Sequence, residues 1–393
     1  MKLSEKLERI APSMTIALFE KANNMIRAGK DVIDFGVGEP DFDTPHNIKE
    51  AAIKALKDGY TKYTPAHGII ELRQAICKKI HRENKLDYTP DEVIVSCGAK
   101  HSLYNAFQAI LNKNDEVIIP TPYWVSYPDM VKLADGFPRL LETKMEDNFQ
   151  INIDNLKKVF TKNTKAIVLN SPSNPSGALY TEETLKELAA FLVDKEIVII
   201  TDDIYEHIIF DNKKFINILN TEPKLKDRTL IINGVSKAYA MTGWRIGYTL
   251  GSQKIIKNMS KIQGQSTSGP NSIAQWASIE ALNNTDDSVR KMCEVFERRR
   301  NLIYKLLKGN QKLKVNKPEG AFYIFPDVSA FFNEEIKTSL TLSEYLLESN
   351  HVSVVPGEGF GAPGKIRLSY AMSDEMIKKG IERLLSGLEK LNK

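Results

Sequence analysis

Five short apolar runs in the first two thirds of the chain constrain its fold more than any other feature. Each run is rich in valine, isoleucine or leucine and is followed by a pattern typical of a helix. Continuous apolar strands of this kind fit a parallel sheet that is covered on both faces. The strand–helix alternation therefore predicts an α/β domain. The runs are 93–95, 117–119, 166–169, 197–200 and 230–232, followed by a less regular one at 245–250.

The rest of the chain shows a different pattern. Helical patterns alternate with short strand-like runs after residue 298, which indicates an α+β fold. A helical pattern also covers 17–28, and the pattern leaves open whether this N-terminal segment packs with the C-terminal part. Helices are expected at 298–307, 343–349 and 375–391, and strands at 315, 321–325, 352–354 and 366–368.

Composition and charge exclude several classes of protein. The 54 basic and 50 acidic residues are mixed along the chain, so we expect neither a nucleic-acid partner nor a membrane-surface patch. No apolar run approaches the roughly 18 residues that span a bilayer, and residues 1–10 lack the apolar core of a signal peptide. The run 298–300 of three arginines is expected on a solvated or salt-bridged helix face.

Cysteine and histidine usage points to a cytoplasmic protein without a metal site. Cys77, Cys97 and Cys293 are far apart and form no CxxC pair, so we expect reduced thiols. The six histidines are scattered, and no cluster has the spacing of metal ligands.

Ligands in open parallel sheets bind outside the carboxyl ends of the strands, so the residues that follow each run are informative. The first run is followed by Gly98, Ala99 and Lys100 and then by a helical pattern. Glycine allows close backbone approach, and a helix start offers free N–H groups to a phosphate. Taken alone, this segment favours an ordinary strand-to-helix turn.

The other four run ends carry side chains of different kinds. Trp124 is placed to stack on a planar ring or to fill a core, and Asn174 lies in a proline-rich loop as a donor or a plain turn residue. Asp202 needs a cation beside a buried strand, or caps a helix. Lys237 is a candidate for a lowered pKa and imine chemistry, or a surface lysine. Arg245 follows eight residues later, between two glycines.

Together these run ends predict a site for pyridoxal 5'-phosphate. A stacking tryptophan, an anion-binding helix start with Ser236 and Arg245, an aspartate, hydrogen-bond donors and one lysine suit a flat, phosphorylated, basic aldehyde. A lysine Schiff base and an aspartate at the ring nitrogen are the usual means by which proteins hold this cofactor.

Longer motifs extend this interpretation to a family. The chain resembles class I aminotransferases of fold type I nearly end to end, and within them the bacterial aspartate aminotransferases. The motifs that carry the resemblance are 38–45, 60–63, 122–128, 170–177, 202–205, 236–237, 241–248 and 367–370.

The resemblance implies a fold and an assembly. A large α/β domain over residues 46–288 would hold a mostly parallel seven-stranded sheet covered by helices. A smaller α+β domain would combine residues 1–45 and 289–393. The family also implies a homodimer with shared active sites.

The resemblance also implies roles for the cofactor site. Lys237 would form the Schiff base and move the proton between the substrate Cα and the cofactor. Asp202 would pair with the ring nitrogen, and Tyr205 and Asn174 would bind the ring oxygen. Trp124 would stack on the ring. The phosphate would be held by Gly98, Ala99, Ser236 and Arg245, beside Lys100, with Tyr63 contributed by a partner subunit.

Substrate residues are implied in the same way. Arg367 would bind the α-carboxylate, helped by the Gly38 backbone, Trp124 and Asn174. Lys100 would bind the distal carboxylate of aspartate, with Ser13 and Thr15 nearby. Relatives that also accept prephenate tend to carry lysine at position 11, where this chain has alanine, so we do not expect that activity. The arginine that more distant aspartate aminotransferases place against the distal carboxylate cannot be located in this sequence.

The implied reaction is ping-pong transamination of L-aspartate and 2-oxoglutarate, which gives oxaloacetate and L-glutamate. Two alternatives remain open with the same cofactor: a transaminase for alanine, aromatic or prephenate substrates, and a C–S lyase. A ligand-sensing transcription regulator would need an added DNA-binding segment. The aminotransferase pattern covers about 13–391, so no such segment is expected.

Overall fold

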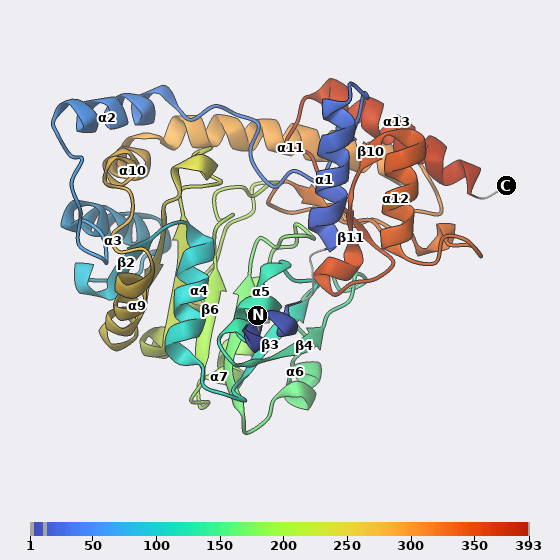
Figure 1. Cartoon of the computed structure of the whole chain (residues 1–393). Helices are drawn as coiled ribbons and strands as arrows, with labels where there is room; N and C mark the ends of the chain where they lie inside the picture. The colour runs from blue at the N-terminus through green and yellow to red at the C-terminus, as the bar shows by residue number, and fades with distance from the viewer. Residues whose placement is uncertain (1–3, 11–13, 392–393) are drawn as a thin grey trace.

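A seven-stranded sheet forms the centre of the large part of the molecule (Figure 1). The computed structural model describes residues 4–10 and 14–391, with backbone only for 14–17. The strand order is β2-β8-β7-β6-β5-β3-β4, and all pairings are parallel except the two made by β8. This confirms the predicted fold class. The strands are β2 (Val93–Ser96), β3 (Glu116–Thr121), β4 (Phe137–Glu142), β5 (Thr164–Asn170), β6 (Val198–Asp202), β7 (Thr229–Gly234) and β8 (Gly247–Leu250).

Successive residues of the central strands alternate between two apolar cores. In β5, Ala166 and Val168 join one core, whereas Ile167 and Leu169 join the other. Because side chains alternate across a strand, both faces of the sheet are buried, and this explains the continuous apolar runs. One core is completed by α4 (Ala99–Ile110), α5 (Ser126–Leu133) and α9 (Gln253–Ser266).

The second core is completed by the remaining helices of this part. Thr181 caps α7, because its hydroxyl accepts from the Thr184 amide at 3.1 Å. The helices are α2 (His46–Lys57), α3 (Ile70–Asn84), α6 (Ile153–Val159), α7 (Glu182–Leu192), α8 (Ile218–Thr221) and α10 (Ser272–Asn284).

Strand β4 was not predicted from the sequence. It lies at the edge of the sheet, and most of its residues are partly or fully exposed. An edge strand needs no continuous apolar run. Arg139 instead makes a two-fold ion pair with Glu116 of β3, at 2.6 and 2.9 Å.

The C-terminal part has its own core and two small sheets. Strand β1 (Ile33–Asp34) pairs in parallel with β10 (Val352–Ser353), and α1 (Met14–Arg27) packs against α12. Residues 14–34 therefore pack with the C-terminal part, whereas residues 5–9 lie against α5 of the large part, where Lys6 and Arg9 pair with Asp135 (Figure 1). The other sheet has the order β11-β12-β9 and consists of β9 (Tyr323–Ile324), β11 (Val355–Pro356) and β12 (Ile366–Ser369). The helices of this part are α11 (Asp286–Lys308), α12 (Ser339–Asn350) and α13 (Asp374–Lys390).

Two details of the C-terminal part qualify the sequence predictions. The run around Val315 is not a strand, because Lys314 forms only an isolated bridge with Asp327. The division into domains at residues 45/46 and 288/289 stays a prediction.

Short 3-10 helices complete the described structure at η1 (Glu5–Arg9), η2 (Pro90–Glu92), η3 (Pro223–Arg228), η4 (Thr242–Trp244), η5 (Ser329–Phe331) and η6 (Gly357–Phe360). Among the described residues, no helix is both long and apolar enough to cross a membrane.

The three consecutive arginines of α11 differ in burial. Arg298 is exposed and pairs with Asp374. Arg299 is buried and binds Asp41 through two hydrogen bonds of 2.7 and 2.8 Å, and Arg300 is fully buried on Asp211 at 2.9 Å. The expected ion pairs exist, but only Arg298 lies on a solvated face.

We expect Arg300→Leu to lower the free energy of unfolding by about 2 kcal/mol, since it removes a fully buried guanidinium and leaves the Pro318 carbonyl without its donor. Arg298→Leu, two residues away on the same helix but exposed, should cost less than about 1 kcal/mol. Urea unfolding followed by circular dichroism measures both. Equal effects of the two substitutions would contradict the assigned difference in burial.

Candidate active site

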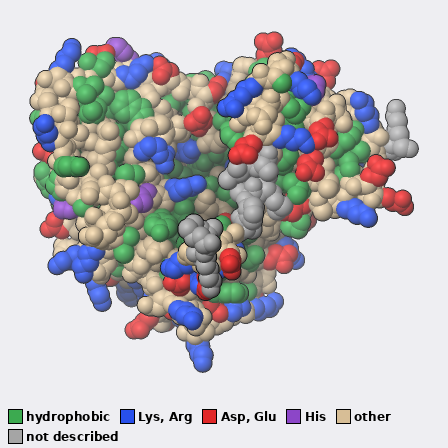
Figure 2. Space-filling view, viewed as in Figure 1, with side chains coloured by type: hydrophobic (Ala, Val, Ile, Leu, Met, Phe, Trp, Pro, Cys, Tyr) green, Lys and Arg blue, Asp and Glu red, His purple; other side chains and the backbone are tan. Residues whose placement is uncertain are grey.

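A cavity of about 310 Å³ opens where the carboxyl ends of β5, β6 and β7 face the C-terminal part. Figure 2 shows this face hollowed between the two parts. Its volume is within the range of about 300–1,000 Å³ that is usual for small-molecule sites. Of the residues predicted from the sequence, the cavity is lined by Gly38, Ala99, Lys100, Trp124, Asn174, Asp202, Tyr205, Ser236, Lys237, Arg245 and Arg367.

Lys237 supplies an amine inside this cavity. It follows β7 by three residues, and its Nζ donates to the Gly38 carbonyl at 2.6 Å. Burial lowers the pKa of Lys237 to about 8, although the charge of the nearby Glu39 carboxylate partly opposes this shift. A larger share of this lysine is therefore neutral, and nucleophilic, at neutral pH than of an ordinary lysine.

Asp202 ends β6 with one oxygen bonded and one free. Tyr127 donates its hydroxyl to Oδ2 at 2.5 Å, whereas Oδ1 is buried without a partner. Burial raises the pKa of Asp202 to about 6, although the Tyr127 hydrogen bond lowers it. A buried acceptor needs a donor. A protonated ring nitrogen has the required chemistry, so the residues present fit pyridoxal phosphate.

Arg367 brings a guanidinium from β12 to the loop after β5. It donates to Asn174 Oδ1 at 3.0 Å and to the Gly36 carbonyl at 2.7 Å, while its Nε is buried without a partner. The guanidinium lies over the Tyr323 ring, 4.5 Å from the centroid. A planar guanidinium held in this way is suited to a carboxylate.

An anion site lies at the start of α4. Gly98 has a φ of 92°, and a Cβ there would come 2.5 Å from Arg245 Nη2, so only glycine fits. Arg245 is held by the Thr242 carbonyl at 2.9 Å. Ala99 at the helix start, Ser236 and Arg245 all line the cavity, and this combination suits a phosphate.

Lys100 lies beside Trp124, with its Nζ 4.9 Å from the centroid of that ring. Burial, and then the charge of Arg245, lower the pKa of Lys100. Among the described residues, no carboxylate lies within ion-pair distance of Lys100. It is therefore a cation available to a ligand.

Four predicted residues are not placed in the cavity. Gly98 lies behind Arg245, and Tyr63 is fully exposed. Ser13 lies outside the described residues, as does Ala11, and Thr15 belongs to α1 with its side chain outside the description.

The sequence analysis missed two tyrosines of the site. Tyr127 bonds Asp202, and the Tyr323 hydroxyl lies 2.9 Å from that of Tyr205. Tyr127 lies on α5 and Tyr323 on β9, so neither follows a strand of the large sheet. The expectation that site residues follow the carboxyl ends of parallel strands therefore does not predict them.

Comparisons with known proteins give a consistent result. The profile of the family described as aminotransferase class I and II matches residues 30–384. The aspartate aminotransferase of Bacillus subtilis is 46% identical over 99% of this chain and 100% of that protein. A probable aspartate/prephenate aminotransferase of Rickettsia bellii is 49% identical over 97% of this chain and 98% of that protein. The solved structure of Thermus thermophilus aspartate aminotransferase with maleate superposes with a TM-score of 0.93 at 43% identity, and covers 98% of this chain and 100% of that one.

We expect uptake of pyridoxal phosphate by the cofactor-free protein to accelerate as the pH rises through about 8. The reason is that the pKa of Lys237 is lowered to about 8 and only its neutral amine reacts with the aldehyde. Stopped-flow absorbance of the visible band measures the rate, and Lys237→Arg is the control that should form no such band. A rate that does not change between about pH 6.5 and 9.5 would contradict the shifted pKa.

Proposed function

The chain belongs to the family of class I and II aminotransferases, and on that premise we propose that it transfers an amino group between L-aspartate and 2-oxoglutarate. The products are oxaloacetate and L-glutamate, and the cofactor is pyridoxal 5'-phosphate. One observation carries the proposal: a single cavity holds a lysine amine of lowered pKa and a buried carboxylate with an unpartnered oxygen.

The protein's own residues hold the cofactor and move one proton. When bound, pyridoxal phosphate supplies an electron-withdrawing ring that stabilises negative charge at the substrate Cα. Asp202 would keep the ring nitrogen protonated, and Tyr205 and Asn174 would hydrogen-bond the ring oxygen. Trp124 would stack on the ring. The Nζ of Lys237 would accept the proton from the substrate Cα as a general base and then donate it as a general acid.

Two cations divide the work of recognising the substrate. Arg367 binds the α-carboxylate that every amino and oxo acid has in common. Lys100 binds the distal carboxylate, since it enters the same cavity without a carboxylate partner among the described residues. The relatives named aspartate aminotransferase, and the Thermus structure with maleate, support an acidic substrate.

The active protein is a homodimer in the cytoplasm. Exposed apolar side chains gather along α2 and the segment that leads to α3, and such patches mark interaction surfaces. They include Ile53, Leu56, Tyr60, Tyr63 and Ile70. The fully exposed Tyr63 then reaches the phosphate in the other subunit. Three free cysteines are typical of a reducing compartment.

The half-reaction with a single amino acid tests the function. L-aspartate should convert the visible band to the pyridoxamine form, and 2-oxoglutarate should restore it. Faster conversion with L-alanine or L-phenylalanine would show that this amino acid, and not L-aspartate, is the preferred substrate. Release of pyruvate and ammonia from L-cystathionine would favour the C–S lyase.

We expect Lys100→Met to lower kcat/KM for L-aspartate about 100-fold, or about 2.7 kcal/mol, as for loss of a hydrogen bond to a charged group. The same variant should change kcat/KM for L-alanine less than about threefold, because alanine has no distal carboxylate. Stopped-flow half-reactions give both ratios. Equal losses for the two amino acids would show that Lys100 serves the cofactor and not the distal carboxylate.

We expect Tyr63→Phe to raise the dissociation constant of pyridoxal phosphate about tenfold, or about 1.4 kcal/mol, without dissociating the dimer. Equilibrium dialysis measures the affinity, and sedimentation equilibrium should give about twice the chain mass of 44.3 kDa for both proteins. Tyr60→Phe is the control three residues away, with a hydroxyl that is not assigned to the phosphate. A monomeric wild-type protein would refute the shared site.

A further inference from the structure

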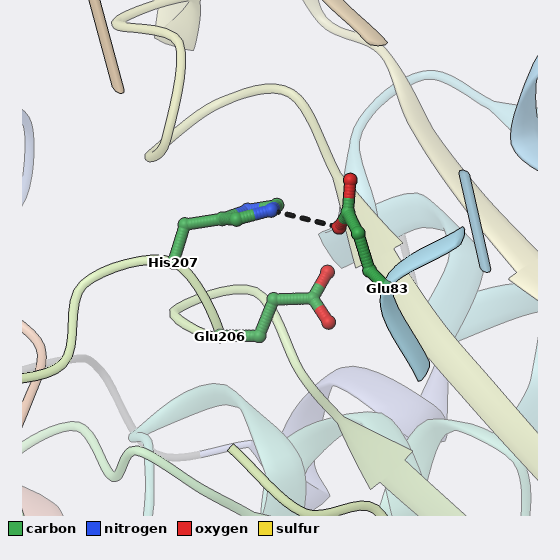
Figure 3. Close-up of side chains that lie close together, drawn as sticks. All are labelled: Glu83, Glu206 and His207. Atoms are coloured by element: carbon green, nitrogen blue, oxygen red, sulfur yellow. Dashed lines mark hydrogen bonds and ion pairs between the residues drawn. The ribbon is translucent and has the colours of Figure 1, made fainter. Parts of the chain in front are cut away.

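A cluster of titratable side chains lies outside the cavity, behind the loop that carries Tyr205. Glu83 comes from α3, and Glu206 and His207 come from the loop after β6 (Figure 3). Their ligand atoms all lie within 4.8 Å of one another, and His207 bonds Glu83 at 2.9 Å. By residue type this is a possible metal site. The sequence spacing does not indicate this cluster, because Glu83 is more than 120 residues before Glu206 and His207 in the chain.

A cation of the protein itself already lies at this cluster. The fully buried Lys79 donates its Nζ to Glu206 Oε1 and lies 3.1 Å from Glu83 Oε2. Asn233 also donates to Glu206 Oε1, at 2.5 Å, and Asn84 donates to Oε2 at 3.3 Å. Both oxygens of Glu206 are therefore in use, and a metal ion would meet the Lys79 ammonium at close range.

The charge of Lys79 is fixed by its partners. Burial alone would lower its pKa, but the carboxylates of Glu206 and Glu83 more than offset burial, and the pKa of Lys79 lies well above its ordinary value. Lys79 is therefore an ammonium at neutral pH, and the acidic cluster has a cation of the protein itself beside it.

The contacts of Glu206 reach both catalytic loops. It follows Tyr205 directly in the chain, and its hydrogen bond from Asn233 reaches the end of β7, four residues before Lys237. The Asp203 amide also donates to the Ile232 carbonyl at 2.9 Å, so the two loops are bonded through backbone as well. Lys79 ties both loops to α3, a helix that contributes nothing to the cavity lining.

We propose that Lys79, through Glu206, is a positioning residue for Tyr205 and Lys237, and that this ammonium, not a metal ion, is the cation of the cluster. This inference rests on the proposed cofactor. In this proposal the Lys79–Glu206 pair fixes the positions of Tyr205 and Lys237 and also stabilises the fold.

The test separates positioning from stability with a neutral pair. In Lys79→Met/Glu206→Gln no buried charge is left unpaired, so the double variant should melt within about 5 °C of the wild type. The lone Lys79→Met should melt lower than the double variant, since it leaves Glu206 without its ammonium. Lys186→Met is the matched control, because Lys186 also pairs with a glutamate four residues away, Glu182 at 2.7 Å, but on an exposed helix face.

The readouts are properties of the bound cofactor, measured without substrate. In the double variant we expect the pH midpoint of the visible band to move by at least about 0.5, and the dissociation constant of pyridoxal phosphate to rise about tenfold. The Lys186→Met control should change neither. A folded double variant with both properties unchanged would show that the network serves stability alone and would overturn the proposal.

Two further outcomes are informative. One equivalent of Zn²⁺ bound by the wild-type protein in calorimetry, and lost in His207→Ala, would show that a metal displaces the ammonium and would also overturn the proposal. A wild-type protein that takes up no pyridoxal phosphate would instead refute the proposed function, so the two failures are distinguishable.

Discussion

Burial of the carboxyl ends of β5, β6 and β7 is the constraint on which the rest of the site depends. The same burial moves the pKa of Lys237 down to about 8 and that of Asp202 up to about 6, so both groups shift toward their neutral forms. Burying two such groups costs less free energy when neighbouring polar atoms have partners. Tyr127 and Asn174 provide partners within the site, and the Lys79 network does so one layer behind it.

The sequence was sufficient wherever a side chain follows a buried parallel strand. The apolar runs became strands, and Trp124, Asn174, Asp202 and Lys237 line one cavity. The reason is physical, because parallel strands end at one edge of the sheet and the topology brings their next residues together. The family resemblance added Arg367, which no strand-end rule would have placed beside Asn174.

The sequence was insufficient wherever a contact joins distant segments. Tyr127, Tyr323 and the Glu83–Glu206–His207 cluster depend on how helices and loops pack, and no local spacing encodes that. Strand β4 was missed because most of its residues are partly or fully exposed and it carries no continuous apolar run. The burial of Arg299 and Arg300 was missed for a related reason, since charged residues on a helix are usually exposed unless a distant acid, here Asp41 or Asp211, pairs with them.

The parallel pair of β1 and β10 has a consequence for how the chain is made. Ile33 leaves the ribosome more than three hundred residues before Val352, its partner across the pair. All seven strands of the large sheet have been synthesised by Leu250, so this sheet can fold before β10, the pairing partner of β1, has been made. Synthesis of the last residues therefore both closes the C-terminal core and fixes the beginning of the chain, and a nascent chain stalled before β10 would expose the apolar face of α1.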